Sequence, residues 1–123
     1  FNGYTASFIS YANVRIIIIK KNIKINNKTT IKNINKKFSI EEYNLILHIT
    51  QFSEIISTSI KNINTQKIAS YLYDLADIFH IFFHKCKINN SNEKKFRLLL
   101  CNTTSKIMNI CFFILNLNKI KKM

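Results

Sequence analysis

Residues 68–86 space their apolar side chains in a way that strongly favours one α-helix with a single buried face. The side chains that follow one another at intervals of four and three residues are Ile68, Leu72, Leu75, Phe79, Phe82 and Cys86. Successive helical turns bring such positions to the same side, so they form one apolar stripe. Tyr71, Tyr73, Asp74 and Asp77 fall off that stripe. The pattern therefore predicts a core helix with polar and aromatic groups on its remaining surface.

The rest of the chain indicates further helices rather than strands. There is no proline and only one glycine, so clusters of Asn and Ser mark the breaks between elements. Ser39, followed three residues later by Glu42, is a capping box and predicts the start of a helix. We expect an all-α bundle of about five helices. The first is expected at 5–21, the second from Ser39 to about 49, and the third at 52–60. The fourth would run from an N-cap near Thr65 to 86, and the fifth would begin after the turn at 89–92.

Charge gives a second constraint, because 19 Lys and Arg residues against 6 Asp and Glu leave a net charge of +13. Such a chain attracts polyanions, with nucleic acid or an anionic membrane as the natural partner. Ile, Asn and Lys all have A/T-rich codons, so genome composition accounts for part of this charge. The longest apolar runs, 16–19 and 111–115, are far shorter than the ~18–20 residues that span a bilayer, so no membrane partner is expected.

The cysteines are odd in number and lie in expected helices, which favours free thiols in a reducing compartment. They are Cys86, Cys101 and Cys111. We therefore expect a cytoplasmic location, with an organelle matrix as the alternative.

Two separated motifs, in the same order, resemble one known family. One is the ordered series Ala69, Tyr71, Leu72, Tyr73, Leu75, Ala76, Phe79, Phe83 and Cys86. The other is the segment 1–16, with matches at Gly3, Thr5, Ala6, Tyr11, Ala12, Arg15 and Ile16 and departures at Tyr4, Ser7, Phe8 and Ser10. Together they resemble the C-terminal, DALR-type anticodon-binding domain of arginyl-tRNA synthetases, which is α-helical.

The resemblance implies one domain over residues 1–123. Residues 1–21 would form a first helix at the junction with a catalytic domain. Residues 22–38 are rich in Asn and Lys, and this composition favours a mobile connection over the alternative of a short strand or helix. The parent enzyme would attach arginine to its tRNA with ATP and Mg²⁺. The sequence contains neither a His-x-Gly-His-like nor a Lys-Met-Ser-Lys-like segment. No catalytic residue or cofactor is therefore expected in this chain, which alone should be inactive.

The expected partners are the anticodon stem-loop of arginine tRNA and the catalytic domain of the same enzyme, in a monomer. Phe8, Tyr11 and Arg15 are spaced three and four apart, so they occupy adjacent helical turns. Aromatic rings and an arginine plane can stack on unpaired anticodon bases, and the family uses these three positions in that way. The alternative is that Phe8 and Tyr11 are core residues and Arg15 a solvated charge.

Tyr71 and Tyr73 are two residues apart on a helix, so at most one of them can point into a site shared with the first helix. We favour Tyr71 slightly. A buried tyrosine with its hydroxyl satisfied locally is the alternative for either one. By resemblance Met123 packs near the same loop, whereas a disordered terminus is the alternative.

Metal binding and catalysis lack support in the sequence. His80 and His84 share a helical face, but Cys86 points elsewhere and a structural zinc site needs four ligands. No nucleophile is accompanied by a base and an orienting group, and Asp74 with Asp77 fits a solvated helix face. Two further functional hypotheses remain open. The chain could be a freestanding RNA-binding helical module, or a decayed, non-catalytic relic that persists as a structural bundle.

Overall fold

The computed structural model describes residue 15 and residues 38–62, 64–88 and 93–121. Over these residues the chain forms helices α2 (Ile40–Thr50), α3 (Phe52–Asn62), α4 (Thr65–Lys85) and α5 (Lys94–Lys121). No strand occurs in these ranges, which confirms the all-α class. The expected first helix, apart from Arg15, and residues 22–37 of the expected connection lie outside the described residues. The expectation of about five helices is therefore not confirmed.

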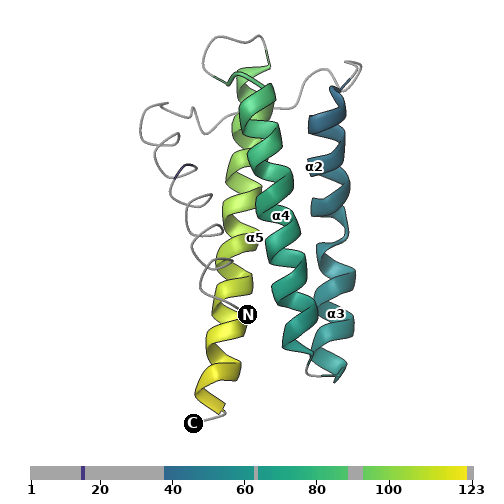
Figure 1. Cartoon of the computed structure of the whole chain (residues 1–123), viewed down its shortest axis with the longest axis vertical. Coiled ribbons are helices and arrows are strands. Elements are labelled where there is room, and N and C mark those ends of the chain that lie inside the picture. The colour runs from purple at the N-terminus through teal and green to yellow at the C-terminus, as the bar shows by residue number, and fades with distance from the viewer. Residues whose placement is uncertain (1–14, 16–37, 63, 89–92, 122–123) are drawn as a thin grey trace.

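Helix α4 is the centre of the bundle (Figure 1). It lies beside α5 on one side, while α2 and α3 follow one another along another side. Only Gln51 separates α2 from α3, and its backbone N–H still donates to the His48 carbonyl at 3.2 Å. The separate short helix expected at 52–60 is present, and it extends to Asn62.

The capping box at Ser39 is formed as predicted. The Ser39 Oγ accepts a hydrogen bond from the Glu42 backbone N–H at 3.2 Å, and the Glu42 Oε1 accepts one from the Ser39 N–H at 3.0 Å. Each side chain satisfies a backbone donor that the first turn leaves open. The N-cap of α4 is Asn64, one residue before the expected Thr65, because the Asn64 side chain accepts from the Lys67 N–H at 3.2 Å.

All six residues of the predicted stripe on α4 are buried. They pack with apolar side chains from the neighbouring helices, including Leu45 of α2 and Cys101, Met108 and Cys111 of α5. The prediction that Tyr71 lies off the buried face is wrong, since only 4% of this residue is exposed. The stripe is wider than expected because side chains of α2 and α3 cover the flank of α4 that carries Tyr71.

The segment Lys94–Asn116 of α5 is long and apolar enough to cross a membrane by length and composition. The short apolar runs had not indicated this. However, 44% of its 18-residue apolar window is buried inside the bundle, and Leu98, Cys101 and Met108 on it belong to the core. The packing explains the buried part of this apolar character, whereas Leu99, Ile110 and Phe113 of α5 are exposed.

Candidate nucleic-acid interface

Arg15 and Phe83 form a contact between the N-terminal segment and α4. The Arg15 Cζ lies 4.8 Å from the centre of the Phe83 ring. Both residues are half-buried, and Arg15 is helical. A guanidinium this close to a ring face is held by a cation–π interaction, worth about 0.5–2 kcal/mol depending on its exposure to water. The contact therefore fixes one of the predicted site residues against the core helix.

Phe83 lies in a small aromatic group near the end of α4. Its ring centre is 6.2 Å from that of Phe79 and 6.0 Å from that of His84, whose ring meets it edge-on. Phe79 is fully buried, whereas His84 is exposed. The group thus runs from the core to the surface, where the Arg15 guanidinium and the His84 imidazole lie beside Phe83.

An arginine plane beside an aromatic ring is the kind of surface on which an unpaired nucleic-acid base can stack. Sequence reasoning did not include Phe83 among the candidate site residues. A signal was present, because Phe83 belongs to the series of matched positions on α4. Its contact with Arg15 could not be predicted, because helical spacing gives no information on contacts between residues so far apart in the sequence.

Tyr71 lies in a closed arrangement with α2 and α3. Its hydroxyl donates to the His48 carbonyl at 2.7 Å, and its own carbonyl lies 3.1 Å from the His48 Nε2. The two rings stack at 4.2 Å with an interplanar angle of 10°. The Phe52 ring lies 5.8 Å away. We call Tyr71, His48, Phe52 and the nearby Cys111 the tyrosine seam.

Burial also changes the acid–base chemistry of this seam. Desolvation, together with the neighbouring Cys111 thiol, raises the pKa of the Tyr71 phenol. Burial raises the pKa of the Cys111 thiol to about 12. Both groups therefore stay neutral near pH 7, and a neutral buried thiol is a poor nucleophile. The seam has the chemistry of a packed core, with its hydroxyl satisfied inside the protein.

Tyr73 is placed differently from Tyr71, because 37% of it is exposed on the outer surface of α4. Asp74 and Asp77 are exposed on the same helix. Since each helical residue rises 1.5 Å, Tyr73 lies roughly 15 Å from Phe83 along the axis of α4. The preference for Tyr71 as the tyrosine that points into a site shared with the first helix stays a prediction, and of the two residues Tyr73 is the exposed one.

The remaining predicted site residues, Phe8, Tyr11 and Met123, lie outside the described residues. Of the histidines considered for metal binding, His80 is buried and His84 is exposed. Within the described ranges no group of three or more His, Cys, Asp or Glu side chains could hold a metal ion. The chemistry that the described residues offer is therefore stacking and positive charge.

Comparison with known proteins gives a consistent result. Residues 9–123 match the family model of the DALR anticodon binding domain. The arginine–tRNA ligase of Protochlamydia amoebophila is 37% identical over 100% of this chain and 21% of its own length. That of Buchnera aphidicola is 41% identical over 98% of this chain and 22% of its own. The chloroplastic/mitochondrial arginine–tRNA ligase of Arabidopsis thaliana is 32% identical over 98% and 19%. The chain thus spans about a fifth of the length of these curated relatives.

Proposed function

Because this chain belongs to the family of DALR anticodon-binding domains, we propose that it binds the anticodon stem-loop of arginine tRNA. It would do so as the C-terminal domain of an arginine–tRNA ligase, whose remaining part would join arginine to the tRNA with ATP and Mg²⁺. This chain would position the tRNA and test its anticodon, and it would contribute no group to the chemical step. The similarity over almost the whole chain to ligases from several organisms supports this assignment.

The observation that carries the proposal is the contact of Arg15 with Phe83, 4.8 Å from the guanidinium carbon to the ring centre. Anticodon bases are unpaired, so their faces are open to stacking while their edges form hydrogen bonds. A flat cation against an aromatic ring offers such a stacking surface. It also carries a positive charge that attracts the phosphates on either side of the base.

Phe8 and Tyr11 precede Arg15 at helical spacing and would extend the stacking surface along the same segment. Of the two tyrosines on α4, Tyr73 would contribute, since its exposure supports contact with RNA. Tyr71 would act indirectly by holding α4 against α2 and α3, because its hydroxyl and ring are already engaged. Met123 would contact the loop, as expected from the resemblance.

The oligomeric state and the location follow as parts of the same proposal. A monomer suffices, because the proposed stacking surface is built from one chain. Free, buried thiols at Cys86, Cys101 and Cys111 fit a reducing compartment, either the cytoplasm or an organelle matrix.

The test is binding of a labelled stem-loop with the anticodon of arginine tRNA, compared with the same stem carrying altered anticodon bases. The intact chain is expected to prefer the first loop. Stacking of one base is worth about 1–3 kcal/mol, so Phe83→Leu should weaken that binding about tenfold and reduce the preference. Fluorescence anisotropy at fixed salt measures both quantities.

Tyr43→Leu is the matched control, because Tyr43 is an aromatic residue that is 52% exposed on α2. It should leave both affinities unchanged. Equal affinity of the intact chain for the two loops, falling steeply with added salt, would contradict anticodon recognition. That result would favour a general RNA-binding module or a relic that has kept only its charge.

A further inference from the structure

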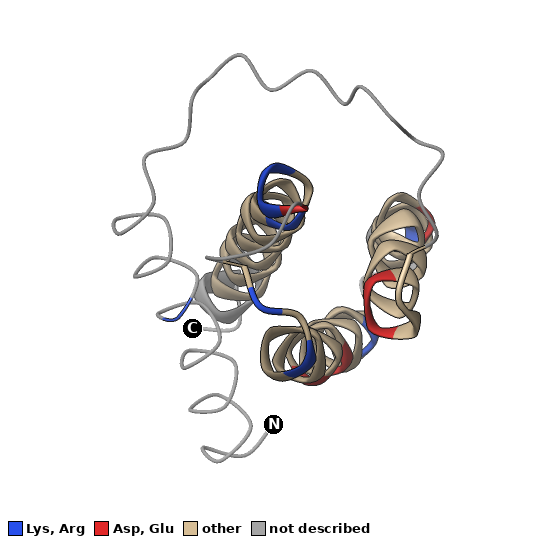
Figure 2. Ribbon diagram, turned by 90° about the horizontal axis from the view of Figure 1, so that it is seen from above, with Lys and Arg blue, Asp and Glu red and all other residues tan. Residues whose placement is uncertain are grey.

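Four lysines gather at the end of the bundle where α4 passes to α5. Lys85 lies in the last turn of α4 and Lys87 follows it, while Lys94 and Lys95 open α5. Figure 2 looks onto this end and shows blue Lys and Arg positions at the adjacent ends of the two helices. Lys85, Lys87 and Lys95 are exposed, and Lys94 is half-buried. We call these four residues the basic corner.

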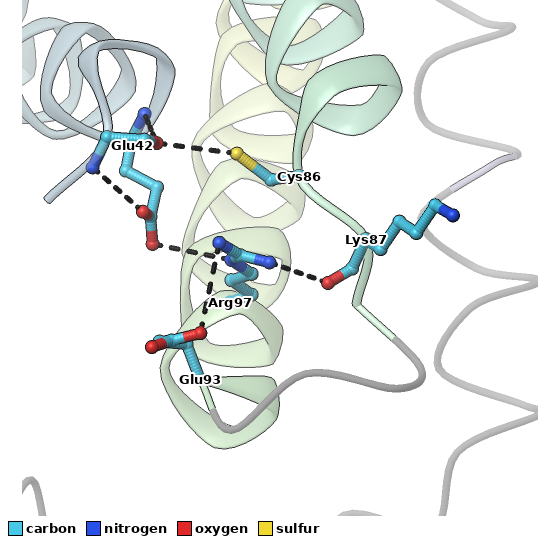
Figure 3. A network of polar contacts seen from close by, with 6 residues as sticks. Glu42, Cys86, Lys87, Glu93 and Arg97 are labelled. Atoms are coloured by element: carbon cyan, nitrogen blue, oxygen red, sulfur yellow. Dashed lines mark hydrogen bonds and ion pairs between the residues drawn. The ribbon is translucent and has the colours of Figure 1, made fainter.

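A polar network holds the two sides of this corner together (Figure 3). The Arg97 Nη1 donates to the Lys87 carbonyl at 2.7 Å, which ties the start of α5 to the segment after α4. The Glu42 Oε2 lies 3.5 Å from the Arg97 Nε, and the Glu93 Oε2 lies 4.0 Å from its Nη2. The Glu42 and Arg97 side chains are only 4% and 14% exposed.

The network also determines which charges remain available. Glu42 and Glu93 both approach Arg97, so their negative charge is directed to a guanidinium inside the network. Among the described residues, neither carboxylate is ion-paired with an ammonium group of the basic corner. Four positive charges therefore gather beside a rigidly tied backbone.

The positions of Lys94 and Lys95 are not explained by the stability of α5. A helix dipole favours carboxylates in the first turn and disfavours cations there. The first turn of α5 nevertheless contains two lysines and no acidic residue, and the one carboxylate directly before it, Glu93, approaches Arg97. Positive charge has accumulated where the local electrostatics of the helix oppose it, which favours a role in binding an anion.

We propose that the basic corner contacts the phosphate backbone of bound RNA, beside the bases that stack near Arg15 and Phe83. This rests on the proposed function for the identity of the RNA and adds a separate, sequence-independent contact to it. Lys85 lies two residues beyond Phe83, about 3 Å along the axis of α4, although the two side chains leave the helix on different faces. Both therefore belong to the same end of α4, and a phosphate backbone that continues past bases stacked at Phe83 would reach this end. Arg97 acts as a positioning residue, because it holds the Lys87 backbone against α5.

The experiment compares two triple variants that lose the same charge. One is Lys87→Gln with Lys94→Gln and Lys95→Gln, in the corner. The other is Lys61→Gln with Lys67→Gln and Lys106→Gln, all exposed and elsewhere in the described part of the chain. The probe is the labelled anticodon stem-loop of arginine tRNA, titrated at several salt concentrations, with thermal unfolding of each variant as a check on the fold.

Each phosphate contact contributes about 0.7–0.9 to the slope of log affinity against log salt concentration. The corner variant is expected to lose about 2 from that slope, and the control variant less than half as much. The corner variant should weaken binding to cognate and altered loops by the same factor, since phosphate contacts carry no base information. Equal slopes in the two variants would overturn the proposal.

The two proposals fail in different ways. If the intact chain does not distinguish the loops, anticodon recognition fails, while the difference in slope between the variants still decides the role of the corner. If the loops are distinguished and the slopes are equal, the corner alone is wrong.

Discussion

Tyr71 and Phe83 lie three turns apart on α4 and have different environments. The Tyr71 ring is stacked at 4.2 Å on His48, and its hydroxyl donates to the His48 carbonyl. Phe83 is half-buried, and a guanidinium lies over its ring. The two aromatic residues are alike in size and share one helix. What differs is the packing partner, which encloses Tyr71 in the core and places a positive charge over the ring of Phe83.

The two regions also differ in electrostatics. In the tyrosine seam, burial raises the pKa values of both Tyr71 and Cys111, so the seam is neutral. The basic corner consists of four lysines and lies beside the Glu42–Arg97 pair. The net charge of +13 is therefore not distributed evenly, because the tyrosine seam is neutral while lysines gather at the corner. One region of α4 is enclosed in the core, and the other ends among exposed lysines.

The strongest test of this difference substitutes the two tyrosines of α4. Tyr71→Ala should lower the free energy of unfolding by about 3–5 kcal/mol, as for other large aromatic residues removed from a core. Tyr73→Ala should cost less than about 1 kcal/mol, because Tyr73 is 37% exposed. Urea unfolding followed by circular dichroism measures both values. If the free energy of unfolding fell by similar amounts in the two variants, the tyrosine seam would be no better packed than the outer face of α4.

Substitutions at the same two tyrosines also sharpen the comparison when RNA binding is measured. Tyr73→Ala should weaken RNA binding at a concentration where the protein stays folded, and Tyr71→Phe should leave it unchanged. Tyr71→Phe is the suitable partner here because it keeps the ring and removes only the hydrogen bond to His48, at a cost of about 1 kcal/mol.

A smaller effect is expected at the corner. Glu42→Gln keeps a side-chain oxygen that can accept the Ser39 N–H, so it preserves the capping box while it removes the charge that faces Arg97. Glu42→Gln should lower the free energy of unfolding by about 2 kcal/mol. This is below the 3–5 kcal/mol typical of a broken buried ion pair, because Glu93 and the Lys87 carbonyl remain near Arg97.

A double-mutant cycle with Arg97→Met isolates the contribution of the ion pair from that of the cap. A coupling energy between the two positions near zero would mean that the network does not stabilise the corner. A coupling of about 1–2 kcal/mol is expected for two side chains in direct contact within one network.

Local patterns in the sequence predicted much of this fold. The stripe on α4 was correct in all six residues, because a single helix determines that periodicity. The capping box at Ser39 and Glu42 was also correct, since both of its hydrogen bonds join residues three apart. Features that depend on one helix alone could therefore be predicted residue by residue.

Features that depend on two helices could not. Tyr71 sits at the edge of the stripe, and only the arrival of His48 and Phe52 from other helices buries it. The contact of Arg15 with Phe83 and the ion pair of Arg97 with Glu42 also join different elements, so they too depend on how the bundle packs. The family resemblance supplied the fold class and the basis of the proposed function, whereas the burial of Tyr71 and the exposure of Tyr73 depend on the packing of the bundle.

The pH dependence of stability provides the most sensitive measure of how closed the tyrosine seam is. The pKa of the Cys111 thiol is about 12 in the folded chain and about 8.5 when a cysteine is exposed. Above pH 8.5 the unfolded chain therefore loses a proton that the folded chain retains. Because ionisation then favours the unfolded state, the free energy of unfolding falls as pH rises.

Between pH 8 and 9.5 the fall due to Cys111 should be about 1 kcal/mol. Cys111→Ala should remove this part of the pH dependence, whereas Cys86→Ala, which leaves Cys111 in place, should retain it. Urea unfolding at the two pH values measures the difference. If the intact chain and Cys111→Ala show the same change in stability between the two pH values, the Cys111 thiol ionises as readily in the folded protein as in water. Solvent would then reach the contact between α4 and α5, and the contrast between a neutral seam and a charged corner would not hold.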